Sequence, residues 1–99
     1  MSSKYSTTET IRGIEFTFWC TGGVRCKDTD IFVKLDKAFF KEIYTRLFDL
    51  YPTKYMPRER ITLPGFQVCW IDYDKNKVNY GPGIDSALYW NEQKRLGKI

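Results

Sequence analysis

The segment after Asp36 constrains the fold most, because its apolar residues recur at the spacing of an α-helix. Large apolar side chains return every three or four positions and form one broad stripe: Phe40, Ile43, Tyr44, Leu47, Phe48 and Tyr51. Asp is favoured at a helix N-cap, and Pro52 cannot continue a helix. The pattern therefore predicts an amphipathic helix between Asp36 and Pro52, which must bury its stripe against another layer.

The segments on both sides of this helix alternate with a period of two, which is typical of strands. Residues 11–20 and 30–35 give two expected strands before the helix, and residues 22–29 give the connection between them. After the helix, residues 61–73 are apolar on both faces, which favours a central strand, and residues 78–80 return as a short strand. Strict alternation puts Phe66, Val68 and Trp70 on one face and Gln67, Cys69 and Ile71 on the other.

A second helix is expected at the end of the chain, from Asp85 as its N-cap to about Leu96, with Gly97 as its stop. The element order is then ββαββα. It predicts a single α+β domain over residues 10–99, with an antiparallel sheet of about four strands and two helices packed mainly on one face. The polar residues 1–9 are expected to form a flexible N-terminal arm or a short extension of the sheet edge.

The chain contains no histidine, which removes the most common general base and the most common metal ligand. It has no Ser-His-Asp triad, no Cys-His pair and no His-based zinc site. We therefore expect a protein that is not an enzyme and that uses no cofactor and no metal.

The three cysteines are expected to play structural roles. Cys20 and Cys69 lie in apolar runs, where a buried thiol is the default. Cys26 falls in a turn-like stretch beside Arg25 and Lys27, whose charges would favour its thiolate. A reactive Cys26 and a Cys20–Cys26 disulfide both stay open as alternatives.

Charge and aromatic content favour a binding role. The formal net charge is +4, and 17% of the residues are aromatic. Cations neutralise phosphates and aromatic rings stack on bases, so the leading hypothesis is a small nucleic-acid-binding protein that uses the basic and aromatic loop after the first helix. The candidate contact residues are Tyr51, Lys54, Tyr55, Arg58 and Arg60 in and before this loop, together with Arg25, Lys27 and Trp19.

Two other locations could bind a ligand. One is a sheet face bearing Trp19, Phe32 and Ile71, which would be open for stacking if both helices lie on the other side. The other is the segment Gly81–Gly83 before the last helix, where free backbone N–H groups could hold a phosphate. The second location predicts a binder of small anionic ligands such as nucleotides.

The aromatic excess also fits a different class of function, because Tyr, Trp and Arg dominate protein–protein interfaces. In this alternative the chain is an interaction module or inhibitor that covers an acidic protein surface or forms a homodimer, a role that would suit a viral or mobile-element accessory protein. The first residues lack the apolar stretch of a signal peptide, and no run is long enough to cross a membrane. We expect a cytoplasmic protein without membrane contacts.

Overall fold

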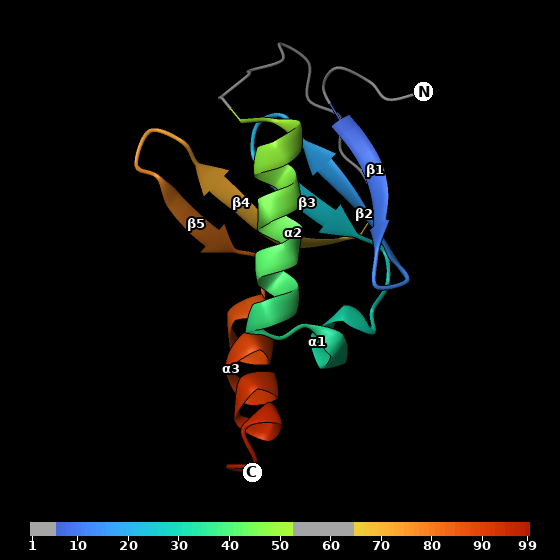
Figure 1. The fold of residues 1–99 in the computed structure, drawn as a ribbon, viewed down its shortest axis with the longest axis vertical. Helices are drawn as coiled ribbons and strands as arrows, with labels where there is room; N and C mark the ends of the chain where they lie inside the picture. Colours follow the sequence, from blue (N-terminus) through green and yellow to red (C-terminus); the bar gives the residue numbers. More distant parts are fainter. Residues whose placement is uncertain (1–5, 53–64) are drawn as a thin grey trace.

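In the computed structural model, which describes residues 6–52 and 65–99, five strands and three helices form an α+β fold (Figure 1). The α+β prediction is confirmed, with one strand and one helix more than expected. The elements are β1 (Ser6–Ile11), β2 (Ile14–Trp19), β3 (Gly23–Cys26), α1 (Ile31–Lys34), α2 (Lys37–Leu50), β4 (Phe66–Asp72), β5 (Lys77–Tyr80) and α3 (Ile84–Arg95).

The sheet is antiparallel throughout, and its spatial order β1-β2-β3-β4-β5 follows the sequence order. β1 forms one edge, where all six of its residues pair with β2. Residues 6–9 therefore belong to an edge strand, and residues 1–5 of the expected arm or edge extension lie outside the described residues. β4 pairs with strands on both sides, as its two apolar faces indicated.

Two elements before α2 differ from the sequence-based expectation. The expected connection over residues 22–29 contains β3, whose Val24 and Cys26 are buried. The expected strand over residues 30–35 is instead the short helix α1. Ile31 and Leu35 are fully buried, while Val33 between them is 72% exposed, so the segment follows a helical turn and not a period of two.

The face of the sheet that packs against α2, here called the inner face, carries the core (Figure 1). Phe16 of β2 meets Phe39 of α2 edge-on, with their ring centroids 5.9 Å apart. The expected N-cap is confirmed, because the Asp36 carboxylate accepts a 2.8 Å hydrogen bond from the Phe39 N–H. Further core side chains come from β2, β3, β4 and the helices, and they include Phe18, Val24, Ile43, Leu47, Cys69 and Ile71.

A β-bulge in β4 changes which of its residues face the core. Val24 pairs with Cys69, but the next residue, Arg25, pairs with Gln67, so Val68 is an extra residue on β4. Val68 and Cys69 are both buried, and the alternation restarts one residue out of phase. Trp70 lies on the opposite face from Cys69 and Ile71, as strict alternation predicted, but because of the bulge it does not share a face with Phe66.

The last helix, α3, begins two residues earlier than expected. Gly83 is its N-cap, with a positive φ of 77°, and Asp85 lies in the first turn without capping it. Gly97 ends the helix with a φ of 74°. α3 is fixed to the α1 segment by Asn91, whose side-chain amide donates to the carbonyl oxygens of Phe32 (2.8 Å) and Leu35 (2.7 Å).

Candidate binding surfaces

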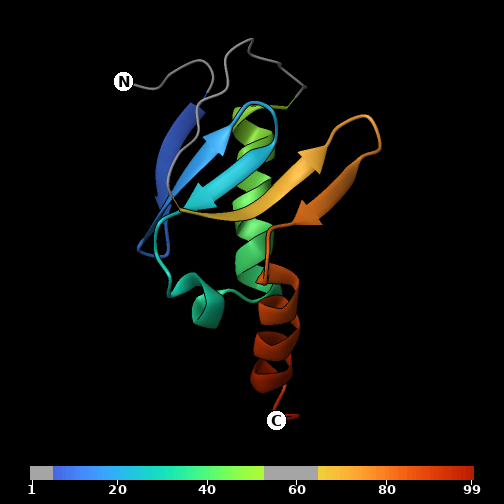
Figure 2. The same cartoon turned by 180° about the vertical axis from the view of Figure 1, so that it is seen from behind.

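The second face of the sheet, here called the outer face, carries no helix among the described residues (Figure 2). One row of residues crosses it from β1 to β5: Ser6 pairs with Trp19, the Trp19 side chain lies against Gly23, and Trp70 pairs with Gly23 and Asn79. Directly opposite residues in antiparallel strands share a face, so the two tryptophans stand on either side of Gly23. Trp70 is 42% exposed and Trp19 is half-buried.

Gly23 allows the two indoles to form one aromatic surface. The Trp19 ring lies against Gly23, with its Cδ1 3.7 Å from the position that a Cβ there would occupy. Strands lie about 4.8 Å apart, so the backbones of Trp19 and Trp70 are separated by about 10 Å, and no side chain stands between them. This row is an aromatic platform of the kind that can stack on flat rings.

A cation adjoins this platform on the same face. Arg25 lies two residues beyond Gly23 on β3, about 7 Å along the strand, and its register partners are Thr17 and Gln67. Its side chain is half-buried. The structure thus brings together two of the residues that the sequence nominated, Trp19 and Arg25, and adds Trp70, which it did not nominate.

The other nominated residues separate into three groups. Lys27 is exposed immediately after β3. Tyr51 has a structural role, because its hydroxyl is hydrogen-bonded to Thr7 Oγ1 (3.0 Å) and its carbonyl accepts a hydrogen bond from the Tyr73 hydroxyl (3.2 Å). The remaining four, Lys54, Tyr55, Arg58 and Arg60, lie outside the described residues, and their contact with phosphates stays a prediction.

The expected combination of Trp19, Phe32 and Ile71 on one open face is wrong. Phe32 belongs to α1 and packs edge-on against Phe66 at 5.1 Å, and Ile71 is buried on the inner face. Sequence alternation correctly placed Trp70 on the face opposite to Ile71, but it grouped Trp70 with Phe66, from which the bulge at Val68 separates it.

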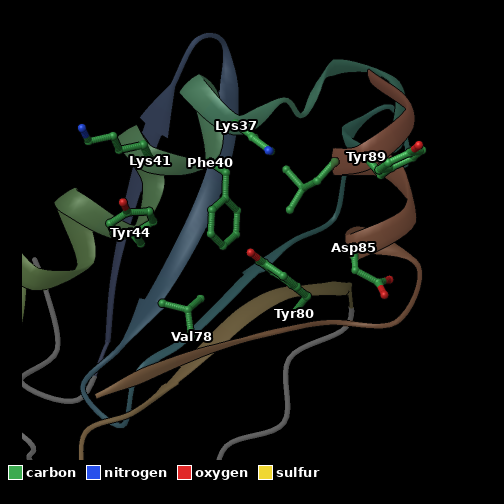
Figure 3. Close-up of a pocket in the computed structure, with 9 residues that line it drawn as sticks. Lys37, Phe40, Lys41, Tyr44, Val78, Tyr80, Asp85 and Tyr89 are labelled. Atoms are coloured by element: carbon green, nitrogen blue, oxygen red, sulfur yellow. The ribbon is translucent and has the colours of Figure 1, made fainter. Parts of the chain in front are cut away.

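A second candidate site is a groove of about 520 Å³ that is bounded by α2, β5 and α3 (Figure 3). Its buried floor includes Phe40 and Leu88, and the Phe40 ring contacts those of Tyr44 and Tyr80 at 5.5 and 5.2 Å. The complete lining is Lys37, Phe40, Lys41, Tyr44, Val78, Tyr80, Asp85, Leu88 and Tyr89. A volume of this size is typical of small-molecule sites.

Charges at the mouth of the groove are mostly positive. Lys37 and Lys41 are one turn apart on α2, whereas Asp85 is the single acidic residue in the lining. The pKa of Glu92 is lowered mainly by its hydrogen bond from Arg95. A hydrogen bond from the Lys37 backbone N–H and the positive charge of Lys37 lower this pKa to a smaller extent. Lys41 forms no ion pair with any residue that the structure describes.

The Gly81–Gly83 segment connects two residues of this groove, Tyr80 and Asp85, but it offers few donors of its own. The Gly81 N–H donates to the Val68 carbonyl at 3.0 Å as part of the sheet ladder. The Phe32 ring lies 3.2 Å from the position of a Cβ at Gly83. One of the N–H groups expected to be free in this segment is therefore already used within the protein.

The reactive-thiol interpretation of Cys26 is wrong. Cys26 is buried in β3, and this burial raises the pKa of its thiol to about 11. Burial also raises the pKa of Cys69 to about 12 and that of Cys20 above its usual value. All three are free cysteines, so the alternative Cys20–Cys26 disulfide is absent.

None of the described helices is long and apolar enough to cross a membrane. Within residues 6–52 and 65–99, no three Cys, Asp or Glu residues come together in a group that could hold a metal ion. No protein-family model, no curated protein and no solved structure matches this chain.

Proposed function

We propose that this chain is a non-enzymatic protein that binds single-stranded nucleic acid across the outer face of its sheet. The observation that carries the proposal is the pair of indoles, Trp19 and Trp70, on a face that no described helix covers. Bases stack on exposed aromatic rings irrespective of sequence, and single strands leave their bases free to do so.

Electrostatics supports the same ligand. Arg25 lies beside the indoles on β3, and Lys27 is exposed at the end of that strand. The whole chain has a net charge of +4, which favours approach to a polyanion. The proposed setting is the cytoplasm, where reducing conditions keep cysteines such as the three free ones here in the thiol form.

The test is a binding titration of the full chain with labelled oligothymidylate and oligouridylate, followed by fluorescence anisotropy at low and physiological salt. We expect Trp70→Ala to raise the Kd about 5- to 150-fold, since stacking contributes about 1–3 kcal/mol per base. Arg25→Gln should reduce the slope of log K against log salt by about 0.7 for each phosphate that the arginine neutralises.

Trp90→Ala is the matched control, because Trp90 lies on α3 and is 54% exposed, comparable with Trp70. This variant should leave the Kd unchanged. Absence of binding by the unmodified chain at low salt would overturn the proposal, as would equal effects of the Trp70 and Trp90 substitutions.

A second candidate function, docking to another protein, is favoured by the exposed apolar residues on α3. Tyr89 and Trp90 form a T-shaped pair with centroids 5.2 Å apart, and both rings are more than half exposed. Lys94 and Lys98 lie farther along this end of the chain, which suits an acidic partner surface or, less favourably, a second positively charged copy. Sedimentation equilibrium of the unmodified chain and of Trp90→Ser would reveal a homodimer that depends on this surface.

A further inference from the structure

The groove between α2, β5 and α3 has the composition of a second ligand site, separate from the outer face. Its floor is apolar, with Phe40 and Leu88 almost completely buried, and its rim is aromatic, with Tyr80 and Tyr89 about half exposed (Figure 3). A cavity with an apolar floor, a few convergent polar groups and a volume of about 520 Å³ suits a compound of the size of one nucleotide.

The rings at the groove favour a flat ligand. Phe40 is in aromatic contact with Tyr44 on one side and with Tyr80 on the other, so three rings from α2 and β5 adjoin one another. In Figure 3 the Tyr80 hydroxyl points toward the Phe40 ring at the centre of the groove, and Tyr89 stands across from it on α3. A planar ring inserted here would meet aromatic surface from both walls.

The charges favour an anion. Lys37 and Lys41 are four residues apart on one face of α2, and like charges at this spacing repel each other. The positive end of the α2 helix dipole already has two carboxylates, because Asp36 caps the helix and Glu92 accepts a hydrogen bond from the Lys37 N–H. Lys37 lies near Glu92, whereas Lys41 has no ion-pair partner among the described residues. An anion at the rim would offset the repulsion between Lys37 and Lys41 and would give Lys41 an ion-pair partner.

Asp85 is the one group in the lining that opposes an anion, but its position limits this effect. Figure 3 shows its carboxylate directed away from Phe40 and from the two lysines. It lies in the first turn of α3, where the helix dipole already stabilises its negative charge.

We propose that this groove binds a small anion that carries a planar ring, with the chemistry of a nucleoside monophosphate. The ring occupies the space among Phe40, Tyr80 and Tyr89, and the phosphate lies toward Lys41 and Lys37 on α2. The proposal does not depend on nucleic-acid binding at the outer face, and the two sites share no residue.

The experiment is calorimetric titration of the full chain with three probes: adenosine 5′-monophosphate, adenosine, and inorganic phosphate. Adenosine 5′-monophosphate is expected to bind saturably. Adenosine has only the planar ring and inorganic phosphate has only the anion, so each is expected to bind several-fold more weakly. Lys41→Gln and Tyr89→Ala should each weaken binding of the monophosphate several-fold. Absence of saturable heat or of any shift in melting temperature at millimolar monophosphate would overturn the proposal.

Two control variants separate this site from general charge and from the outer face. Lys75→Gln removes the same charge from the β4–β5 turn, outside the groove, and should bind like the unmodified chain. Trp70→Ala removes the outer-face indole and should also leave monophosphate binding unchanged. Equal losses of affinity in Lys41→Gln and Lys75→Gln would show that the monophosphate is attracted only by the net positive charge, and would overturn the proposal. Weaker binding of the monophosphate by Trp70→Ala would show that it binds at the outer face, and would also overturn the proposal.

Discussion

The two faces of the sheet are built from the same strands, yet their side chains have opposite environments. On the inner face, Phe16, Phe18 and Val24 are fully buried beneath α2. On the outer face, one residue away along the same strands, Trp19 and Arg25 are only half-buried. The difference shows that alternate residues of one strand can have separate environments: one set builds the core, and the other stays partly exposed on a face that no described helix covers.

The largest expected effect concerns the buried side chains of the inner face. Phe18→Ala removes a fully buried ring from the core and should lower the free energy of unfolding by about 3–5 kcal/mol. Trp70→Ala, on the outer face, should cost much less because its side chain already contacts solvent. Urea unfolding followed by circular dichroism measures both, and similar decreases in the two variants would contradict the division between the faces.

A second prediction compares thiols on the two faces. Cys26 is buried, and its pKa of about 11 against an ordinary value of 9.0 reduces the thiolate fraction at pH 8 about 100-fold. We expect Ellman's reagent to leave all three native thiols unmodified until the chain unfolds. A cysteine introduced on the outer face by Thr17→Cys should react at the rate of an accessible thiol. Rapid reaction of a single native thiol in the unmodified chain would show that the inner face is open.

The smallest expected effect concerns the edge of the inner face, where an ion pair joins β1 to α2. The Arg46 guanidinium donates to both carboxylate oxygens of Glu9, at 2.6 and 2.7 Å, and this hydrogen bonding lowers the pKa of Glu9 below 4.5. A group whose pKa is lowered on folding contributes stability above its unfolded pKa, and this contribution disappears as the pH falls through the lowered folded value.

The urea concentration at the midpoint of unfolding should therefore decrease slightly more in the unmodified chain than in Glu9→Gln when the pH is lowered from about 5 to about 3. This interval extends roughly one pH unit on either side of the ordinary Glu pKa. The difference should be small because the pair is partly exposed to solvent. Identical pH profiles of the two proteins would show that the pair does not tie β1 to α2 in solution.

Much of the fold could be predicted from periodicity. The apolar stripe predicted α2 together with its Asp36 cap, and alternation predicted β2, β4 and β5. α1 was missed because Ile31, Val33 and Leu35 alternate with a period of two, whereas Ile31 and Leu35, four residues apart, also fit one turn of a helix. β3 was missed because only four residues, in a stretch rich in glycine and charge, form the strand, and its neighbours on both sides stabilise it.

The candidate site was less predictable than the fold, for a physical reason. The separation of Trp70 from Phe66 onto different faces depends on the bulge at Val68, and a bulge is a property of the pairing between β3 and β4, not of either strand alone. The groove likewise combines Lys41, Tyr80 and Tyr89 from three elements that are distant in the sequence. The helical spacing of Lys37, Phe40, Lys41 and Tyr44 was visible in the sequence, but nothing there indicated what would face it.

The most direct test of binding at the outer face is tryptophan emission during titration with oligothymidylate in the Trp90→Phe protein. This variant keeps only the two outer-face indoles, Trp19 and Trp70, as tryptophan fluorophores. Base stacking predicts saturable quenching of the emission that weakens as salt is added. Unchanged emission at low salt, with or without oligonucleotide binding by anisotropy, would contradict the assignment of the outer face as the nucleic-acid surface.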